Sequence, residues 1–169
     1  FNTISILTGT GYVSAKFDGW GSFPLTLFLI LMFIGGCAGS TTCGIKIFRV
    51  QILYLFILNQ LKKIIYPKGI FLIKYEQNSV DDKFIASIIS FIYFYFVIFF
   101  LLAALLSLTG LDFITSLSGA ATSISNVGPG LGPIIGPNGD FSSLPDISKW
   151  ILTIGMILGR LELFAILVL

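Results

Sequence analysis

The chain has 169 residues, of which 56% are hydrophobic and 11% are charged, with a net charge of +2 and a mean hydropathy of +0.98. A soluble domain carries about 25% charged residues. The composition therefore excludes an ordinary soluble domain and predicts an all-α integral membrane protein. The sequence contains no histidine, so it lacks the commonest general base and metal ligand.

The chain starts at Phe1 rather than at a methionine, so we expect a fragment whose N-terminal part is missing. Its opening is expected to be loop-like. It contains Thr8-Gly-Thr-Gly-Tyr12, although the surrounding sequence is strongly apolar. A backbone so free of bulky side chains can expose its own carbonyl oxygens to a ligand.

A helix is expected over residues 22–34, with Pro24 in its first turn. Its last 12 residues span about 18 Å, so it ends near the middle of a hydrocarbon core about 30 Å thick. Residues 35–44 contain four glycines, each costing about 1 kcal/mol in a helix interior. An unwound segment is therefore predicted there, with tight helix packing as the alternative, before helical character resumes over residues 45–61.

Seven of the ten basic residues lie between Lys46 and Lys83, in the second half of this broken span and the connection that follows it. The positive-inside rule places this connection, residues 62–83, in the cytoplasm, and the remaining connections on the outer side. Since topology explains the basic residues, no nucleic-acid binding is predicted. The seven are Lys46, Arg49, Lys62, Lys63, Lys68, Lys74 and Lys83.

The next apolar run, residues 84–108, carries no charge and is long enough to cross a membrane. Asp112 is placed to cap a helix over residues 113–124, which is too short to cross. Because the connections at both of its ends are assigned to the outer side, this short helix is predicted to dip into the membrane and return. It leads into a second polar, glycine-rich passage, residues 125–132, and a last span is expected over residues 147–169.

Two passages thus share one plan: a glycine-containing polar segment, an outer loop, a proline and a long span. The predicted architecture is one and a half copies of a unit of span, pore helix, filter strand and span around a central pore, with Gly11 and Gly128 equivalent. Residues 1–61 would hold the filter strand, outer loop and broken second span of one unit. Residues 62–83 would form the connection, and residues 84–169 a whole unit.

The two polar passages are interpreted as filter strands. Irregular backbone at membrane depth is tolerated only where it is buried or lines water, and free carbonyls can replace the hydration shell of a cation. The C-terminal end of the short helix would direct its partial negative charge toward that cation. Packing of helices through small residues is the alternative. A nucleotide-binding loop is not favoured, because neither Gly9-x-Gly11 nor Gly128-x-Gly130 has the flanking residues of such a loop. The predicted ion-binding residues are Thr8, Gly9, Thr10, Gly11 and Tyr12 in one strand and Ser125, Asn126, Val127, Gly128 and Pro129 in the other, with the cation at Thr10, Gly11, Val127 and Gly128.

Arg160 lies deep in the last span, where an arginine costs about 3 kcal/mol and usually faces a cavity or a partner. Glu162 points about 200° away around the helix, so Arg160 is expected to bond to the segment at residues 35–44. A snorkelling arginine at the membrane interface is the alternative. The two cysteines are interpreted as packing residues rather than a disulfide or zinc site. An unwound segment at residues 35–44 could close the pore below the filter, and a positive charge in the pore would repel cations. The predicted gate therefore comprises Gly35, Gly36, Cys37, Ala38, Gly39, Ser40, Thr41, Thr42, Cys43, Gly44 and Arg160.

The passages FIGGCAGSTTCGIKIFRV, SISNVGPGLG and GMILGRLELFAILVL closely resemble the C-terminal part of the TrkH/TrkG potassium uptake proteins of the Trk/Ktr/HKT superfamily. The resemblance implies four units around one pore, of which this chain holds the end of the third and the whole fourth. It assigns residues 35–44 to the family's intramembrane loop and Arg160 to the basic residue that faces it, although Thr42 and Cys43 depart from the usual loop. It also implies a lipid-embedded homodimer in the cytoplasmic (inner) membrane. The implied partner is a cytoplasmic ring of the TrkA type, which would bind any nucleotide, so no cofactor is expected on this chain.

The expected function is potassium uptake, with potassium as the substrate moving inward under the membrane potential. A sodium-permeable or sodium-coupled transporter of the same superfamily is one alternative, and a purely structural membrane subunit is another. A membrane-embedded enzyme is not favoured, because Arg160, Glu162 and hydroxyls are the only candidate catalytic groups at membrane depth. Two filter strands cannot surround an ion, so the others must come from the rest of the same polypeptide.

Overall fold

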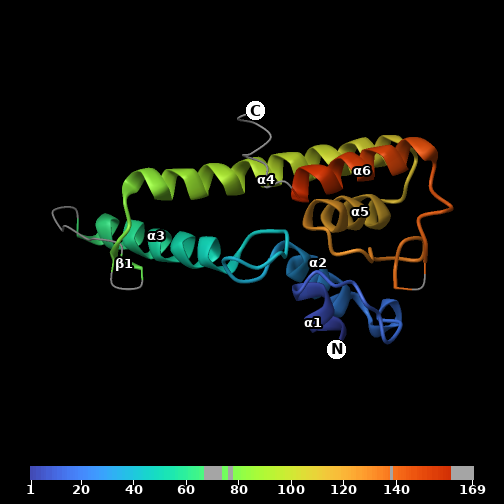
Figure 1. The fold of residues 1–169 in the computed structure, drawn as a ribbon, viewed down its shortest axis with the longest axis horizontal. Coiled ribbons are helices and arrows are strands. Elements are labelled where there is room, and N and C mark those ends of the chain that lie inside the picture. The colour runs from blue at the N-terminus through green and yellow to red at the C-terminus, as the bar shows by residue number, and fades with distance from the viewer. Residues whose placement is uncertain (67–73, 76–77, 138, 161–169) are drawn as a thin grey trace.

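The computed structural model of the chain describes residues 1–66, 74–75, 78–137 and 139–160 (Figure 1). The molecule is elongated and mostly helical, with the longest helix, α4, packed against α3 at one end and against α5 and α6 at the other. In chain order the elements are α1 (Asn2–Leu7), a 3-10 turn (Asp18–Trp20), α2 (Ser22–Phe33), α3 (Ile47–Ile65), β1 (Lys74–Tyr75), β2 (Asn78–Ser79), α4 (Asp82–Leu108), α5 (Phe113–Ser125) and α6 (Asp146–Arg160).

Helix α4 has 27 residues and carries no charge beyond its first turn. Its buried side chains recur every three or four residues and so form one stripe along the helix. The other faces expose large apolar side chains, which suits contact with lipid or with further protein. Among the described residues, α4 is the one helix long and apolar enough to cross a membrane. The buried stripe consists of Ile85, Ile88, Phe91, Tyr95, Phe99, Leu102 and Leu106.

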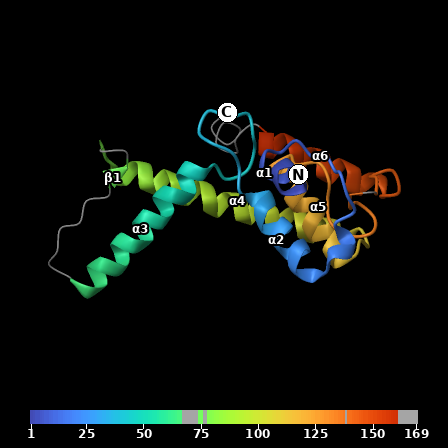
Figure 2. The same ribbon diagram turned by 90° about the horizontal axis from the view of Figure 1, so that it is seen from below.

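Helix α5 packs against both α4 and α6, which also contact each other, and α2 packs against a further side of α5 (Figures 1 and 2). Ten of its 13 residues are buried, and most of these are serine, threonine, alanine or glycine. Small side chains let neighbouring helices approach the backbone closely. The Ser118 hydroxyl accepts a hydrogen bond from the Leu131 N–H at 3.0 Å and donates to the Leu131 carbonyl at 3.1 Å. The chain that follows α5 is thereby held against the flank of the helix.

Helices α2 and α3 are separated by a loop, residues 34–46, whose two ends are hydrogen-bonded to each other. The Gly35 N–H donates to the Ile45 carbonyl at 2.9 Å, and the Ile45 N–H donates to the Phe33 carbonyl at 2.9 Å. A Cβ on Gly35 would lie 2.5 Å from a backbone oxygen of the returning strand. Glycine is therefore needed at this neck, and the helix is interrupted where the glycines of the sequence predicted.

The structure differs from the expectations at the start of the chain and in the connection at residues 62–83, into which α3 continues as far as Ile65. The opening of the chain is not a loop: residues 2–7 form α1, because the Thr8 N–H donates to the Ile4 carbonyl at 2.9 Å and continues a helical ladder. The connection at residues 62–83 also contains the two-residue antiparallel pair β1 and β2, so the described chain is not purely helical. The expected position of Glu162 and the end of the last span lie outside the described residues.

Candidate functional site

The second glycine segment, residues 125–129, leaves the C-terminal end of α5 with two left-handed residues. Asn126 has φ +52° and Gly128 has φ +111°. The N–H of Val127 donates to the Thr122 carbonyl at 3.2 Å, and the N–H of Gly128 donates to the Thr122 hydroxyl at 2.9 Å. The Asn126 side chain donates to the Met156 carbonyl of α6 at 3.0 Å. The segment is thus fastened to both α5 and α6.

The first glycine segment, residues 8–12, leaves α1 in the same way. Gly9 and Gly11 are left-handed, with φ +65° and +71°, and occupy the positions of Asn126 and Gly128. The N–H groups of Thr10 and Gly11 donate to the Ser5 carbonyl at 3.0 and 3.4 Å. Two separate parts of the chain therefore repeat one backbone pattern.

The two glycine segments lie against each other. A Cβ on Gly11 would lie 2.3 Å from the Val127 carbonyl oxygen and 3.1 Å from Cδ of Pro129. A Cβ on Gly128 would lie 3.7 Å from the Gly11 Cα. Both segments line a cavity of about 340 Å³, with Thr10 also in its wall. The structure therefore brings together the four residues at which potassium was predicted.

The hydroxyl groups of Thr8, Thr10 and Ser125 have hydrogen-bond partners outside this contact. The Thr8 hydroxyl donates back to the Ile4 carbonyl at 2.8 Å, and the Tyr12 side chain is exposed. The Ser125 hydroxyl is buried and shares a 2.7 Å hydrogen bond with the hydroxyl of Tyr95 on α4. The backbone, rather than these side chains, forms the surface that the two segments share.

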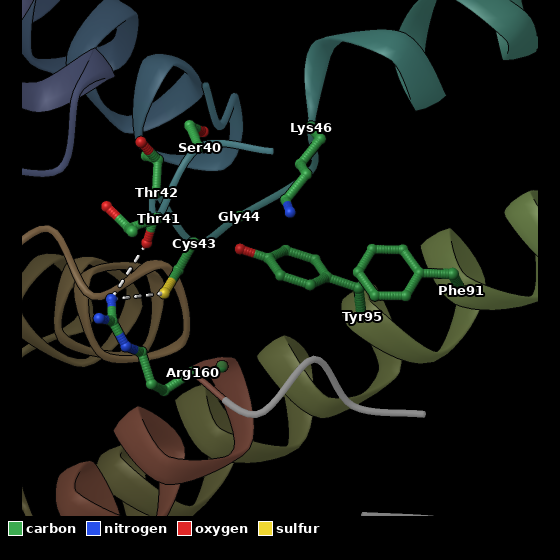
Figure 3. A pocket seen from close by; sticks show the side chains of 10 residues that line it. Ser40, Thr41, Thr42, Cys43, Gly44, Lys46, Phe91, Tyr95 and Arg160 are labelled. Carbon is green, nitrogen blue, oxygen red and sulfur yellow. Dashed lines mark hydrogen bonds between the residues drawn. The ribbon is translucent and has the colours of Figure 1, made fainter. Parts of the chain in front are cut away.

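The 34–46 loop lies directly beside the first segment and receives Arg160 from the end of α6 (Figure 3). The Arg160 guanidinium donates to the Thr41 carbonyl at 3.1 Å and lies 3.8 Å from the Cys43 sulfur. A Cβ on Gly9 would lie 3.4 Å from Cγ2 of Thr42. The contact expected between Arg160 and this loop is present, and the loop also touches the first glycine segment.

A cavity of about 230 Å³ lies beneath this contact (Figure 3). The loop forms one wall with residues that include Ser40 and Thr42, and α4 forms another with Tyr95. The side chains of Lys46 and Arg160 bring two positive charges to it. Both cysteines of the loop are free thiols.

A single turn of α6 links the loop to the second glycine segment. A Cβ on Gly159 would lie 1.9 Å from the Ile124 carbonyl oxygen, so the backbones of α6 and α5 are in direct contact there. Asn126 binds this turn through Met156, and Arg160 extends from it to the loop.

Three of the contributing residues, Tyr95, Thr122 and Gly159, were missed in the sequence, and Asn126 was predicted only as an ion-binding residue. Tyr95 and the side chain of Asn126 act through partners 30 residues along the chain, which no local pattern reveals. The partners of Thr122 lie close to it in the sequence, but nothing in a helix rich in serine and threonine singles this residue out. Gly159 carried a signal, because Gly155-x-x-x-Gly159 has the spacing of small residues at close helix contacts.

Residues 1–169 match the model of the TrkH family, described as "Cation transport protein". The chain is 47% identical to the Trk system potassium uptake protein TrkI of Halomonas elongata and 35% identical to TrkH of Vibrio parahaemolyticus. Both matches cover the whole of this chain and 34% of the relative. The crystal structure of the potassium transporter TrkH from Vibrio parahaemolyticus matches with a TM-score of 0.88 at 33% identity, covering 96% of this chain and 34% of that one. The chain thus spans about a third of the length of the relatives it matches.

Proposed function

Because this chain belongs to the TrkH family of cation transport proteins, we propose that it forms part of a potassium uptake protein. The family consists of membrane transporters rather than enzymes, so a membrane-embedded enzyme is not proposed. Relatives in three bacterial species carry the name Trk system potassium uptake protein, which favours potassium over sodium as the substrate. The cytoplasmic (inner) membrane is the proposed location.

The two glycine segments are the proposed filter strands. The observation that carries this proposal is the approach of the Val127 carbonyl oxygen to Gly11, which brings main-chain oxygens of one strand to the other. Carbonyl oxygens arranged around an axis can stand in for the hydration shell of potassium. Helix α5 ends at Ser125, the first residue of the second strand, so the partial negative charge of its C-terminus lies beside the proposed ion site.

The 34–46 loop and Arg160 are the proposed gate. The loop lies next to the first strand through Thr42, and Arg160 fixes it with a charged hydrogen bond to the Thr41 carbonyl. Hydrogen bonds that involve a charged group are about twice as strong as neutral ones. A positive charge at this position would also repel cations. We propose that displacement of the loop, away from Arg160, opens the pathway.

Two strands cannot enclose an ion, so the complete pore requires the rest of the polypeptide. We propose that residues 1–61 end the third of four units, that residues 62–83 connect the units on the cytoplasmic side, and that residues 84–169 form the fourth. A homodimer and a cytoplasmic nucleotide-binding ring of the TrkA type are the proposed partners. Potassium is the substrate, and no cofactor is assigned to this chain.

The proposal is tested with the full-length protein in bacteria that lack other potassium uptake systems. Gly11→Ser and Gly128→Ser each place a side chain in a left-handed position next to the opposite strand, and both are expected to abolish growth at low potassium and to reduce rubidium uptake. Gly19→Ala is the control, because no atom lies within 4 Å of the added carbon. Wild-type growth and rubidium uptake in both serine variants, at normal protein levels in the membrane, would remove the filter assignment.

A further inference from the structure

Thr122 lies fully buried on α5, one turn before the second glycine segment. Both of its oxygens are used by that segment. The carbonyl accepts the N–H of Val127 at 3.2 Å, and the hydroxyl accepts the N–H of Gly128 at 2.9 Å. A helical carbonyl is an ordinary partner at a helix end, whereas the hydroxyl bond depends on the side chain chosen at this position.

The hydroxyl bond fixes the orientation of one peptide group. The N–H of Gly128 and the C=O of Val127 belong to the same planar, trans unit, so they point in opposite directions. When the N–H is held against Thr122, the carbonyl oxygen must point away from α5. It does so toward Gly11, where an added Cβ would lie 2.3 Å from this oxygen.

Glycine at position 128 makes this restraint necessary. Gly128 has φ +111° and is exposed, and glycine visits several backbone regions at little cost. Without a partner for its N–H, the peptide group between Val127 and Gly128 is free to rotate. A rotated peptide would present an N–H donor, which repels a cation, where a carbonyl oxygen now points.

The corresponding position in the first segment is built differently. Ser5 stands where Thr122 stands, but the Gly11 N–H reaches only the Ser5 main-chain carbonyl, at 3.4 Å. The Ser5 hydroxyl instead shares a 3.1 Å hydrogen bond with the Thr10 hydroxyl. The side-chain restraint on the glycine amide therefore belongs to the second segment, and Ser5 provides a matched control.

We propose that Thr122 is a positioning residue for ion selectivity: its hydroxyl holds the Val127 carbonyl oxygen toward the opposite strand and keeps the Gly128 N–H away from the ion. This inference rests on the proposed filter function of the two segments. It predicts that the Thr122 hydroxyl controls which ion passes, and not merely how much protein folds.

The test compares five variants of the full-length protein, purified and reconstituted in liposomes. Thr122→Val keeps the shape but removes the hydroxyl, and Thr122→Ala also removes it. The other three are Thr122→Ser, Ser5→Ala and Gly128→Ser. The measurement is the ratio of rubidium to sodium flux, which does not depend on the amount of protein. Loss of one hydrogen bond in Thr122→Val is expected to lower the ratio by about fivefold. Thr122→Ser is expected to keep the wild-type ratio. Ser5→Ala is expected to change the ratio less than Thr122→Val does, because the Gly11 N–H is held by a main-chain carbonyl.

Two outcomes would overturn the role of Thr122 while leaving the filter in place. One is a wild-type ratio in Thr122→Val when Gly128→Ser has lost selectivity. The other is an equal loss in Thr122→Ser and Thr122→Val, because the hydroxyl would then not be the cause. If neither Gly128→Ser nor Thr122→Val changes the ratio, the filter proposal itself fails. Thr122→Ala is the second hydroxyl-free variant, and failure of both to reach the membrane would assign Thr122 to folding and overturn the inference.

Discussion

Replacing Gly159 by alanine is expected to separate α6 from the end of α5. The added Cβ would lie 1.9 Å from the Ile124 carbonyl oxygen and 2.7 Å from its carbonyl carbon, whereas real Cβ atoms hardly ever come within 3.0 Å of another atom. The clashing atoms are backbone atoms, which cannot rotate away. Helix α6 must therefore move by about 1 Å in a closely packed interior.

This displacement has two consequences. Overpacking of this kind costs about 1–3 kcal/mol of folding free energy. The same turn of α6 supplies Arg160, which donates to the Thr41 carbonyl at 3.1 Å, and Met156, whose carbonyl accepts the Asn126 amide at 3.0 Å. A shift of about 1 Å takes either distance beyond that of a hydrogen bond. We therefore expect both lower stability and a released loop.

The assay uses the purified full-length protein, with thermal unfolding measured in detergent and rubidium flux measured in liposomes without cytoplasmic partners. Gly159→Ala is expected to unfold at a lower temperature and to show a higher resting flux than wild type. Gly19→Ala adds the same methyl group where no atom lies within 4 Å and is the control. If Gly159→Ala unfolds and conducts like Gly19→Ala, the direct contact between α6 and α5 is wrong.

The remaining predictions concern Arg160 and Tyr95. Arg160→Ala, which removes the bond to the Thr41 carbonyl, is expected to raise resting rubidium flux about tenfold or more by loss of a charge-assisted hydrogen bond of about 1.5–3 kcal/mol, and an unchanged resting flux would count against the gate. Tyr95→Phe leaves the buried Ser125 hydroxyl without its 2.7 Å partner and is expected to destabilise the protein by about 1–3 kcal/mol. Adding Ser125→Ala should recover most of that loss, and thermal unfolding equal to wild type in Tyr95→Phe would contradict the account.

The main helices could be predicted from the sequence because their signals are local. The four glycines at residues 35–44 marked the break between α2 and α3, and Asp112 marked the start of α5. Helix α1 could not be recognised, because six residues are too few to display a helical period. Only the structure shows that the chain leaving α1 repeats the backbone pattern of the chain leaving α5.

The candidate site was predicted only in its outline. Gly11 and Gly128 could be paired from the sequence, since glycine-rich irregular backbone between apolar segments is unusual at membrane depth. The groups that orient the second segment could not be found in this way. Thr122 resembles any small residue on a buried helix, and Tyr95 resembles any aromatic residue of a span, until packing shows what each hydroxyl contacts.

The central claim is that main-chain oxygens of the two glycine segments bind a dehydrated potassium ion on a shared axis. The most direct measurement is the anomalous scattering of rubidium in crystals of the full-length protein. The account predicts a rubidium peak between the segments, in contact with the carbonyl oxygens of Thr10 and Val127. A well-ordered protein with rubidium bound elsewhere, and no peak between Gly11 and Gly128, would contradict it.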